Sequence, residues 1–238
     1  MKKIINILIT ISIVICTIII IYSSFKITTW HLNNKENKKI NDELQESITI
    51  SKGEFKIDFD ELKNKNEDVV AYLKVKNTNI EYIVVKGKNN NYYLNHNFNK
   101  EYNMSGWVFA DYKNKFDGTD KNIIIYGHNI QDGSMFGTLH NILKKDWYEN
   151  EENLKITLIT NDGEQIYKVF SVYQIKDEDY YIKTEFAENE FQKFVENLKK
   201  RSIHNFNEDL KDTNTILTLS TCSASGKERV VLHAKKIQ

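Results

Sequence analysis

The sequence predicts a mostly β domain with a few helices, in which about eight strands close into a mixed β-barrel behind an N-terminal transmembrane helix. Two observations favour the barrel. Most apolar runs are too short for helices, and strands and helices do not alternate as they do in a parallel α/β fold. A third observation favours the membrane helix, because residues 4–22 contain no charge.

The uncharged run is about long enough to cross a hydrocarbon core ~30 Å thick. Lys2 and Lys3 precede the run, and no small residues suited to signal-peptidase cleavage follow it. We therefore expect residues 1–25 to be a cytoplasmic N-terminus and an uncleaved signal anchor, with the remaining domain outside the cell. Lysines just beyond the run act against this orientation: Lys26, Lys35, Lys38 and Lys39.

Residues 26–54 are polar, and their few apolar positions, Ile40, Leu44 and Ile48, are spaced by four. This spacing predicts a helical stalk, or a helix lying on the domain surface. Residues 55–238 contain no internal repeat and no low-complexity linker. We expect this part of the chain to form a single domain.

Short strands dominate the expected domain. β-rich runs predict them at residues 70–75, 80–85, 106–110, 122–126, 154–160, 165–176, 215–221 and 229–234. The turn signal Asn161-Asp162-Gly163 joins two of these runs. Helices are expected at residues 58–66 and around residues 191–198, where apolar residues recur at helical spacing.

The composition argues against a nucleic-acid partner. The chain has 33 basic and 33 acidic residues, so its formal net charge is zero. No basic cluster alternates with exposed aromatic residues, which is the electrostatic pattern of nucleic-acid binding.

The two cysteines differ in their expected surroundings. Cys16 lies inside the apolar N-terminal run, which leaves Cys222 as the lone thiol of an exported domain. A lone thiol cannot form an internal disulfide. Cys222 is therefore either an inert small apolar residue or a nucleophile.

Arg229, seven positions after Cys222, favours the nucleophile. It is one of two arginines in a chain rich in lysine, the other being Arg201. A six-residue loop, 223–228, joins the two expected strands, so the guanidinium would lie close to the thiol. A fixed cation lowers a thiol pKa, and its planar donors suit a carbonyl oxygen. The alternative is an ion pair between Arg229 and Glu228 or another surface acid.

One of the six histidines stands out as a candidate acid or base. His128 follows the apolar run 123–126 and Gly127, a position typical of a residue that lines a cleft. The others are expected to be packed or solvated side chains: His31, His96, His140, His204 and His233.

These motifs together resemble those of class B sortases. Tyr126-Gly127-His128-Asn129, followed by Gly133-Ser134-Met135-Phe136, resembles their histidine motif. Thr218-Leu219-Ser220-Thr221-Cys222 with Arg229 resembles their TLxTC motif and its trailing arginine. Residues 92–100 and 106–112 are also similar, and the likeness covers roughly residues 55–238 in the family's order.

The resemblance implies the sortase-like eight-stranded closed barrel and a cysteine transpeptidase. Such an enzyme cleaves a C-terminal sorting pentapeptide of secreted proteins after threonine, through a cysteine thioester, and transfers the acyl group to a peptidoglycan precursor amine. Cys222 would be the nucleophile, His128 the acid and base, and Arg229 the oxyanion partner. Ser220 and Thr221 would bind substrate, with Thr221 at the oxyanion site.

The resemblance implies no metal or other cofactor, and the sequence has no acids at ligand spacing. The partners it implies are secreted proteins with a sorting signal, the precursor amine, and the cell membrane through residues 4–22. Two alternatives remain. Another cell-wall cysteine peptidase fits less well because His128 precedes Cys222, and an L,D-transpeptidase because its Ser-His-Gly lead-in and its arginine two residues after the cysteine are absent. A membrane-anchored non-catalytic β-domain would require an inert Cys222.

Overall fold

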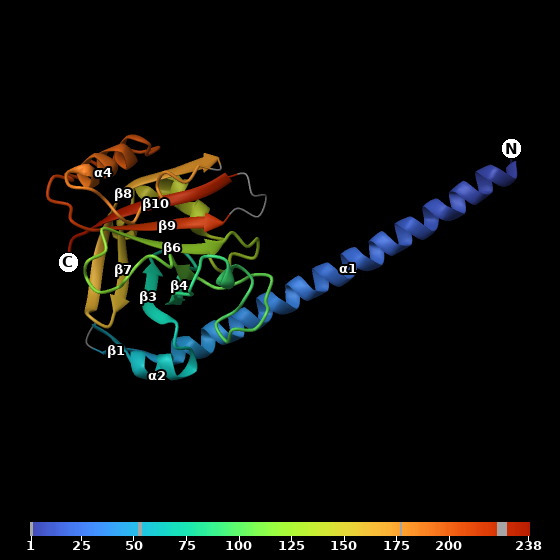
Figure 1. The fold of residues 1–238 in the computed structure, drawn as a ribbon, viewed down its shortest axis with the longest axis horizontal. Helices are drawn as coiled ribbons and strands as arrows, with labels where there is room; N and C mark the ends of the chain where they lie inside the picture. The colour runs from blue at the N-terminus through green and yellow to red at the C-terminus, as the bar shows by residue number, and fades with distance from the viewer. Residues whose placement is uncertain (1, 52–53, 177, 223–227) are drawn as a thin grey trace.

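The computed structural model describes residues 2–51, 54–176, 178–222 and 228–238, with the backbone alone at residues 49–51, 54, 55 and 222. Figure 1 shows a β-barrel with one long helix that projects from it and ends at the N-terminus. Apart from Glu228, the loop expected between Cys222 and Arg229 lies outside the described residues.

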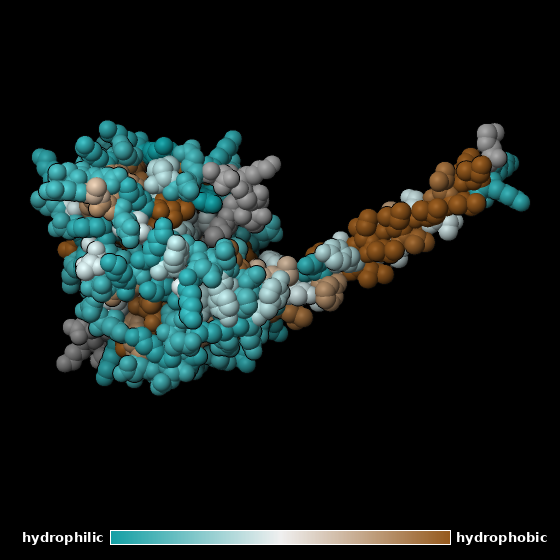
Figure 2. Space-filling view, viewed as in Figure 1, coloured by the Kyte–Doolittle hydropathy of each residue, from teal (hydrophilic) through white to brown (hydrophobic). Residues whose placement is uncertain are grey.

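Helix α1 runs without a break from Lys2 to Glu46. The apolar run and most of the expected stalk therefore form one helix. The apolar residues of its first half are exposed and cover that half of its surface (Figure 2). The helix is long and apolar enough to cross a membrane. Ile40 and Leu44, one turn apart, are buried against the barrel, as their spacing predicts.

The predicted closed barrel is confirmed. Within the described residues eight strands close it in the order β10-β8-β7-β3-β4-β5-β6-β9. They are β3 (Val69–Val75), β4 (Glu81–Val85), β5 (Phe109–Ala110), β6 (Asn122–His128), β7 (Lys155–Thr160), β8 (Gly163–Lys176), β9 (Ile216–Cys222) and β10 (Glu228–Lys236). The pairs β4–β5 and β6–β9 are parallel, so the barrel is mixed. Strands β1 (Ile48–Ser51) and β2 (Glu54–Ile57) pair separately.

Strand β5 is shorter than the run 106–110 predicts. Gly106 has φ +57°, and a Cβ there would lie 2.3 Å from the Tyr93 carbonyl oxygen. Only glycine fits this approach, which bends the chain before the strand. Trp107 is fully buried and donates from Nε1 to the Ile83 carbonyl at 2.8 Å. The first part of the run therefore anchors a loop in the core.

Both predicted helices form. Helix α2 (Phe59–Lys65) starts at Asp58, whose carboxylate accepts a hydrogen bond from the Glu61 N–H, the usual N-cap contact. Helix α4 (Glu190–Lys200) packs Val195 and Leu198 into an apolar cluster that includes residues of β8. The shorter helices are η1 (Tyr92–Leu94), η2 (Leu139–Leu143), α3 (Lys145–Tyr148) and η3 (Glu151–Leu154).

A buried polar chain links the strands beneath α4. Thr218 Oγ1 donates to Asn122 Oδ1 at 2.7 Å, so its oxygen accepts from His233 Nδ1, 2.9 Å away. His233 Nε2 lies 2.8 Å from the Tyr173 hydroxyl, which donates to it. These bonds satisfy a neutral imidazole. Complete burial lowers the pKa of His233 to about 3.

This burial predicts an acid-sensitive fold. Because the pKa of His233 is lower in the folded protein than the ordinary 6.5, the unfolded chain binds more protons below pH 6.5. His233 should therefore lower the free energy of unfolding by about 1.4 kcal/mol at pH 5.5, and by less than about 0.1 kcal/mol at pH 7.5. Denaturant titrations of the wild type and His233→Gln between pH 7.5 and 5 measure this. The same pH dependence in both proteins would contradict it.

Candidate active site

The parallel pair β6–β9 ends with the predicted histidine and cysteine side by side. Its register runs from Asn122 opposite Ile216 to His128 opposite Cys222. Neighbouring strands lie ~4.8 Å apart, so the two backbones meet at the carboxyl ends of the strands. For Cys222 the structure describes the backbone alone.

Arg229 reaches the same end of the barrel from β10, the antiparallel neighbour of β9. Thr221 joins the two strands there, because its Oγ1 accepts from the Val230 N–H at 2.8 Å. The Arg229 guanidinium lies 3.4 Å from the Tyr181 hydroxyl, which also lies 2.8 Å from Ser220 Oγ. Tyr181 thus connects two predicted site residues, although the sequence analysis did not single it out.

A cavity of about 380 Å³ opens beside these residues. It is lined by Asn90, Asn91, Leu94, Phe109, Tyr126, His128, Ile182, Ser220, Thr221 and Arg229. The structure therefore brings together His128, Arg229, Ser220 and Thr221 around one cavity. Its apolar walls and few polar groups are typical of a small-molecule or peptide site.

The His128 ring is held by a backbone carbonyl. Its Nε2 lies 2.8 Å from the Leu94 oxygen, and since a carbonyl can only accept, Nε2 carries the hydrogen. Burial lowers the pKa of His128 below its ordinary 6.5, against the opposing effect of this hydrogen bond. The ring is therefore neutral at pH 7, with the lone pair on Nδ1.

The Leu94 carbonyl is itself fixed by its neighbours. Asn89 Oδ1 accepts from the N–H groups of Asn91 and Tyr92, which starts the turn η1. At the other end, the Trp107 N–H donates to the Tyr93 carbonyl at 3.0 Å, and Gly106 makes this close approach possible. The chain around Leu94 is thus held by a local turn on one side and by buried Trp107 on the other.

Asp111 orders another wall of the cavity. Its carboxylate is buried and accepts from the Tyr126 hydroxyl at 2.9 Å and from Asn90 Nδ2 at 2.8 Å. Both donors line the cavity. Asp111 was not among the predicted site residues, although an acid directly after the apolar run ending at Ala110 is a recognisable signal.

The remaining histidines lie elsewhere. His31 is exposed on α1, and His140 is exposed on η2. His96 stacks on Tyr92, and His204 stacks on Tyr148. With His233 in the core, His128 is the histidine of the described residues that lines this cavity.

Comparison with known proteins assigns the fold and motifs to a family. A family model described as a sortase domain matches residues 73–237. The sortase B of Listeria monocytogenes is 34% identical over 231 residues, which are 92% of this chain and 92% of that protein. The chain belongs to the class B sortases. It is thus a member of a transpeptidase family, and the resemblance found in its motifs is confirmed.

Solved class B sortases have the same fold. The sortase B of Bacillus anthracis, in complex with AAEK1, is 31% identical with a TM-score of 0.77, and the match covers 87% of this chain and 99% of that one. The sortase B of Staphylococcus aureus complexed with MTSET is 34% identical with a TM-score of 0.69, over 75% and 77% of the two chains.

The environment of His128 predicts its titration. In the Cys222→Ala variant, which lacks the thiol, His128 should titrate below pH 6.5, because burial penalises the imidazolium. Below that midpoint the ring gains its second proton on Nδ1, since Nε2 is already protonated. Histidine-selective NMR titration measures both. A midpoint above 6.5, or a neutral ring protonated on Nδ1, would contradict this geometry.

Proposed function

We propose that this sortase cleaves a C-terminal sorting pentapeptide of secreted proteins after threonine and transfers the threonyl group to an amine of a peptidoglycan precursor. The observation that carries the proposal is the β6–β9 register, which pairs His128 with Cys222 at a cavity that Arg229 also lines. The substrate chemistry follows the sequence resemblance, and the family supports it.

In this proposal residues 1–25 contain the cytoplasmic N-terminus and the membrane anchor, residues 26–54 the stalk, and residues 55–238 the extracellular catalytic domain. The exposed apolar first half of α1 supports the anchor. On the outer face of the membrane, the catalytic domain would meet both exported proteins and wall precursors.

Cys222 is the nucleophile in the first half-reaction. Its thiol gives its proton to Nδ1 of the neutral His128 ring, and the resulting thiolate bonds to the threonine carbonyl carbon. As the tetrahedral intermediate collapses, the peptide C–N bond breaks. His128, protonated on Nδ1 at that stage, gives this proton to the departing amine while Nε2 keeps its bond to Leu94. The products are a thioester and the released C-terminal peptide.

The second half-reaction reverses these roles. The incoming amine attacks the thioester carbonyl, and Nδ1 of the now neutral His128 takes the proton that the amine loses. The C–S bond breaks and the thiolate is restored. Because thioesters are more reactive toward amines than oxygen esters are, a bound amine competes effectively with water.

Arg229 stabilises the oxyanion in both half-reactions. A guanidinium offers several donors in a fixed plane, and Tyr181 lies within reach to orient it. Ser220 and Thr221 border the same cavity and bind the substrate beside the reacting carbonyl. Thr221 Oγ1 accepts from the Val230 N–H, which fixes the side chain and leaves its own hydrogen to donate to the substrate.

The thiol chemistry has support from a relative. The sortase B of Staphylococcus aureus was solved as a complex with MTSET, a reagent that modifies thiols. We expect Cys222 to react in the same way, which an inert core cysteine would not do.

The proposal is tested with a panel of sorting peptides, offered with and without candidate wall amines, and product identification by mass. Wild type should release the peptide after threonine and form the amine adduct. Cys222→Ala should keep the thermal midpoint of wild type and lose cleavage entirely. Turnover that persists without the thiol would exclude the thioester route.

Replacing Arg229 by lysine separates charge from geometry. Arg229→Lys keeps a cation but loses the planar donors, and an oxyanion donor is typically worth ~3 kcal/mol. We expect the turnover number to fall at least ~10-fold. Arg201→Lys is the matched control, because that arginine stacks on Tyr180 and pairs with Glu178 outside the cavity. Equal rates for Arg229→Lys and wild type would show that charge alone suffices.

A further inference from the structure

The second half of α1 docks on the barrel through buried amides. Asn34 and Asn37 are almost fully buried, which is unusual for asparagine and requires that their polar atoms be bonded. Asn41 and Gln45, further along the helix, both donate to the Glu81 carbonyl on β4. The first two amides instead bind two loops that flank His128.

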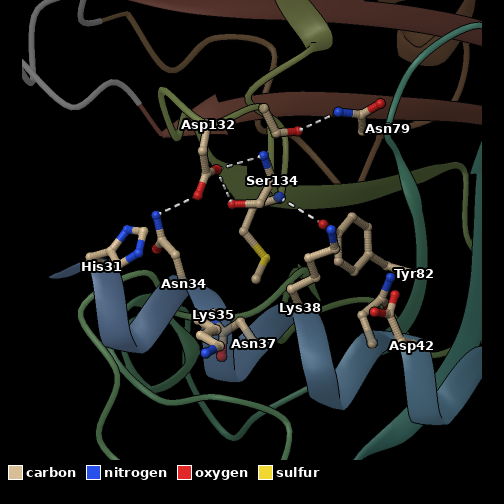
Figure 3. A pocket seen from close by; sticks show the side chains of 13 residues that line it. His31, Asn34, Lys35, Asn37, Lys38, Asp42, Asn79, Tyr82, Asp132 and Ser134 are labelled. Atoms are coloured by element: carbon tan, nitrogen blue, oxygen red, sulfur yellow. Dashed lines mark hydrogen bonds between the residues drawn. The ribbon is translucent and has the colours of Figure 1, made fainter. Parts of the chain in front are cut away.

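Asn34 joins these two loops directly. Its Nδ2 donates to Asp132 Oδ2 at 2.7 Å, and its Oδ1 accepts from the Ser105 hydroxyl. Asp132 Oδ1 in turn accepts from the Ser134 N–H at 2.9 Å and from its hydroxyl at 2.6 Å. Figure 3 shows Asn34 on α1 pointing up to Asp132. Both residues line a cavity of about 550 Å³.

The loop that carries Asp132 begins directly after His128. It returns at Phe136, whose N–H donates to the His128 carbonyl at 2.9 Å. The Phe136 ring also lies over Gly127, where an added Cβ would be 2.6 Å from it. The backbone of His128 is therefore packed against both ends of loop 129–136.

The loop that carries Ser105 begins directly after Leu94, whose carbonyl binds the His128 ring. Asn37 Nδ2 donates to the Gly106 carbonyl at 3.0 Å, and Asn33 Oδ1 accepts from the Met104 N–H. The same segment returns to Tyr93, next to Leu94, through the Trp107 N–H. Helix α1 thus holds the loop that positions the ring partner.

We propose that Asn34 positions His128 by fastening two loops to α1: its bond to Asp132 holds the loop that follows this histidine, and its bond to Ser105 holds the loop that follows Leu94, the partner of the ring. Asn34 and Asp132 are positioning residues, since their hydrogen bonds are with these loops and with each other. The catalytic consequence rests on the role of His128 under the proposed function.

The test exchanges donor and acceptor in full-length protein held in detergent micelles. Asn34→Asp places two carboxylates against each other. Asp132→Asn leaves one acceptor oxygen for both Asn34 Nδ2 and the Ser134 N–H, so the new amide nitrogen faces another donor in either orientation. The double variant moves the carboxylate to α1 and the amide to the loop, which restores one donor and one acceptor. Coupling between the two sites is then read as a double-mutant cycle.

Two quantities are measured in each variant. The first is the ring Nε2–H resonance of His128, protected from exchange by its bond to Leu94 and assigned by its loss in His128→Asn. The second is the kcat and KM for a sorting peptide. Both single variants should lose the protected resonance and about 10-fold in kcat at nearly constant KM, and the double variant should regain both.

Asn41→Ala is the matched control, because it removes an amide that docks the same helix to β4 away from both loops. It should keep the resonance and kcat of wild type. Single variants that match wild type, or a folded double variant as impaired as the singles, would overturn the proposal. If no peptide is turned over, the proposed function fails, and the resonance still decides whether the bond positions the ring.

Discussion

The parallel pairing of β6 with β9 is the constraint on which the rest of this molecule depends. Parallel neighbours need a long crossover, and here the chain between His128 and Ile216 supplies β7, β8 and α4 on the way. A slip of one residue would separate His128 from Cys222 and turn every side chain of β9 to the other face. The buried hydrogen bonds from Asn122 through Thr218 to His233 can form only in this register. They therefore fix the same alignment of β6 and β9 as the apolar packing does.

The electrostatics of the candidate site follow from a neutral ring partner. A carboxylate beside His128 would stabilise the imidazolium, whereas the Leu94 carbonyl fixes the tautomer without adding a charge. The nearby buried acid, Asp111, is instead bonded to Tyr126 and Asn90. The ring therefore remains a weak base that releases its proton readily. The positive charge near the cavity comes from Arg229, where an oxyanion would need it.

The sequence predicted the barrel, its strands and the His128, Cys222 and Arg229 motifs, because short apolar runs and local motifs are properties of neighbouring residues. It did not predict contacts that join distant segments. Leu94 acts through its backbone, which no side-chain pattern reveals. Asp111 and Tyr181 look like ordinary loop residues until β6 and β9 are placed beside them. A helical stalk was predicted from the sequence, but its fusion with the membrane helix into one unbroken α1 was not.

Because α1 is one unbroken helix, the segment between the proposed membrane anchor and the barrel is rigid. At 1.5 Å per residue, Asn34 stands about 18 Å from Tyr22 along the helix axis. In a chain anchored as we propose, the cavity lined by His128 would keep a fixed distance from the bilayer and a fixed orientation, because α1 is bonded to the barrel at several points. Such an enzyme would reach only substrates whose cleavage site lies at that distance from the membrane. The segment that attaches each substrate to the membrane would have to be long enough to place the cleavage site there.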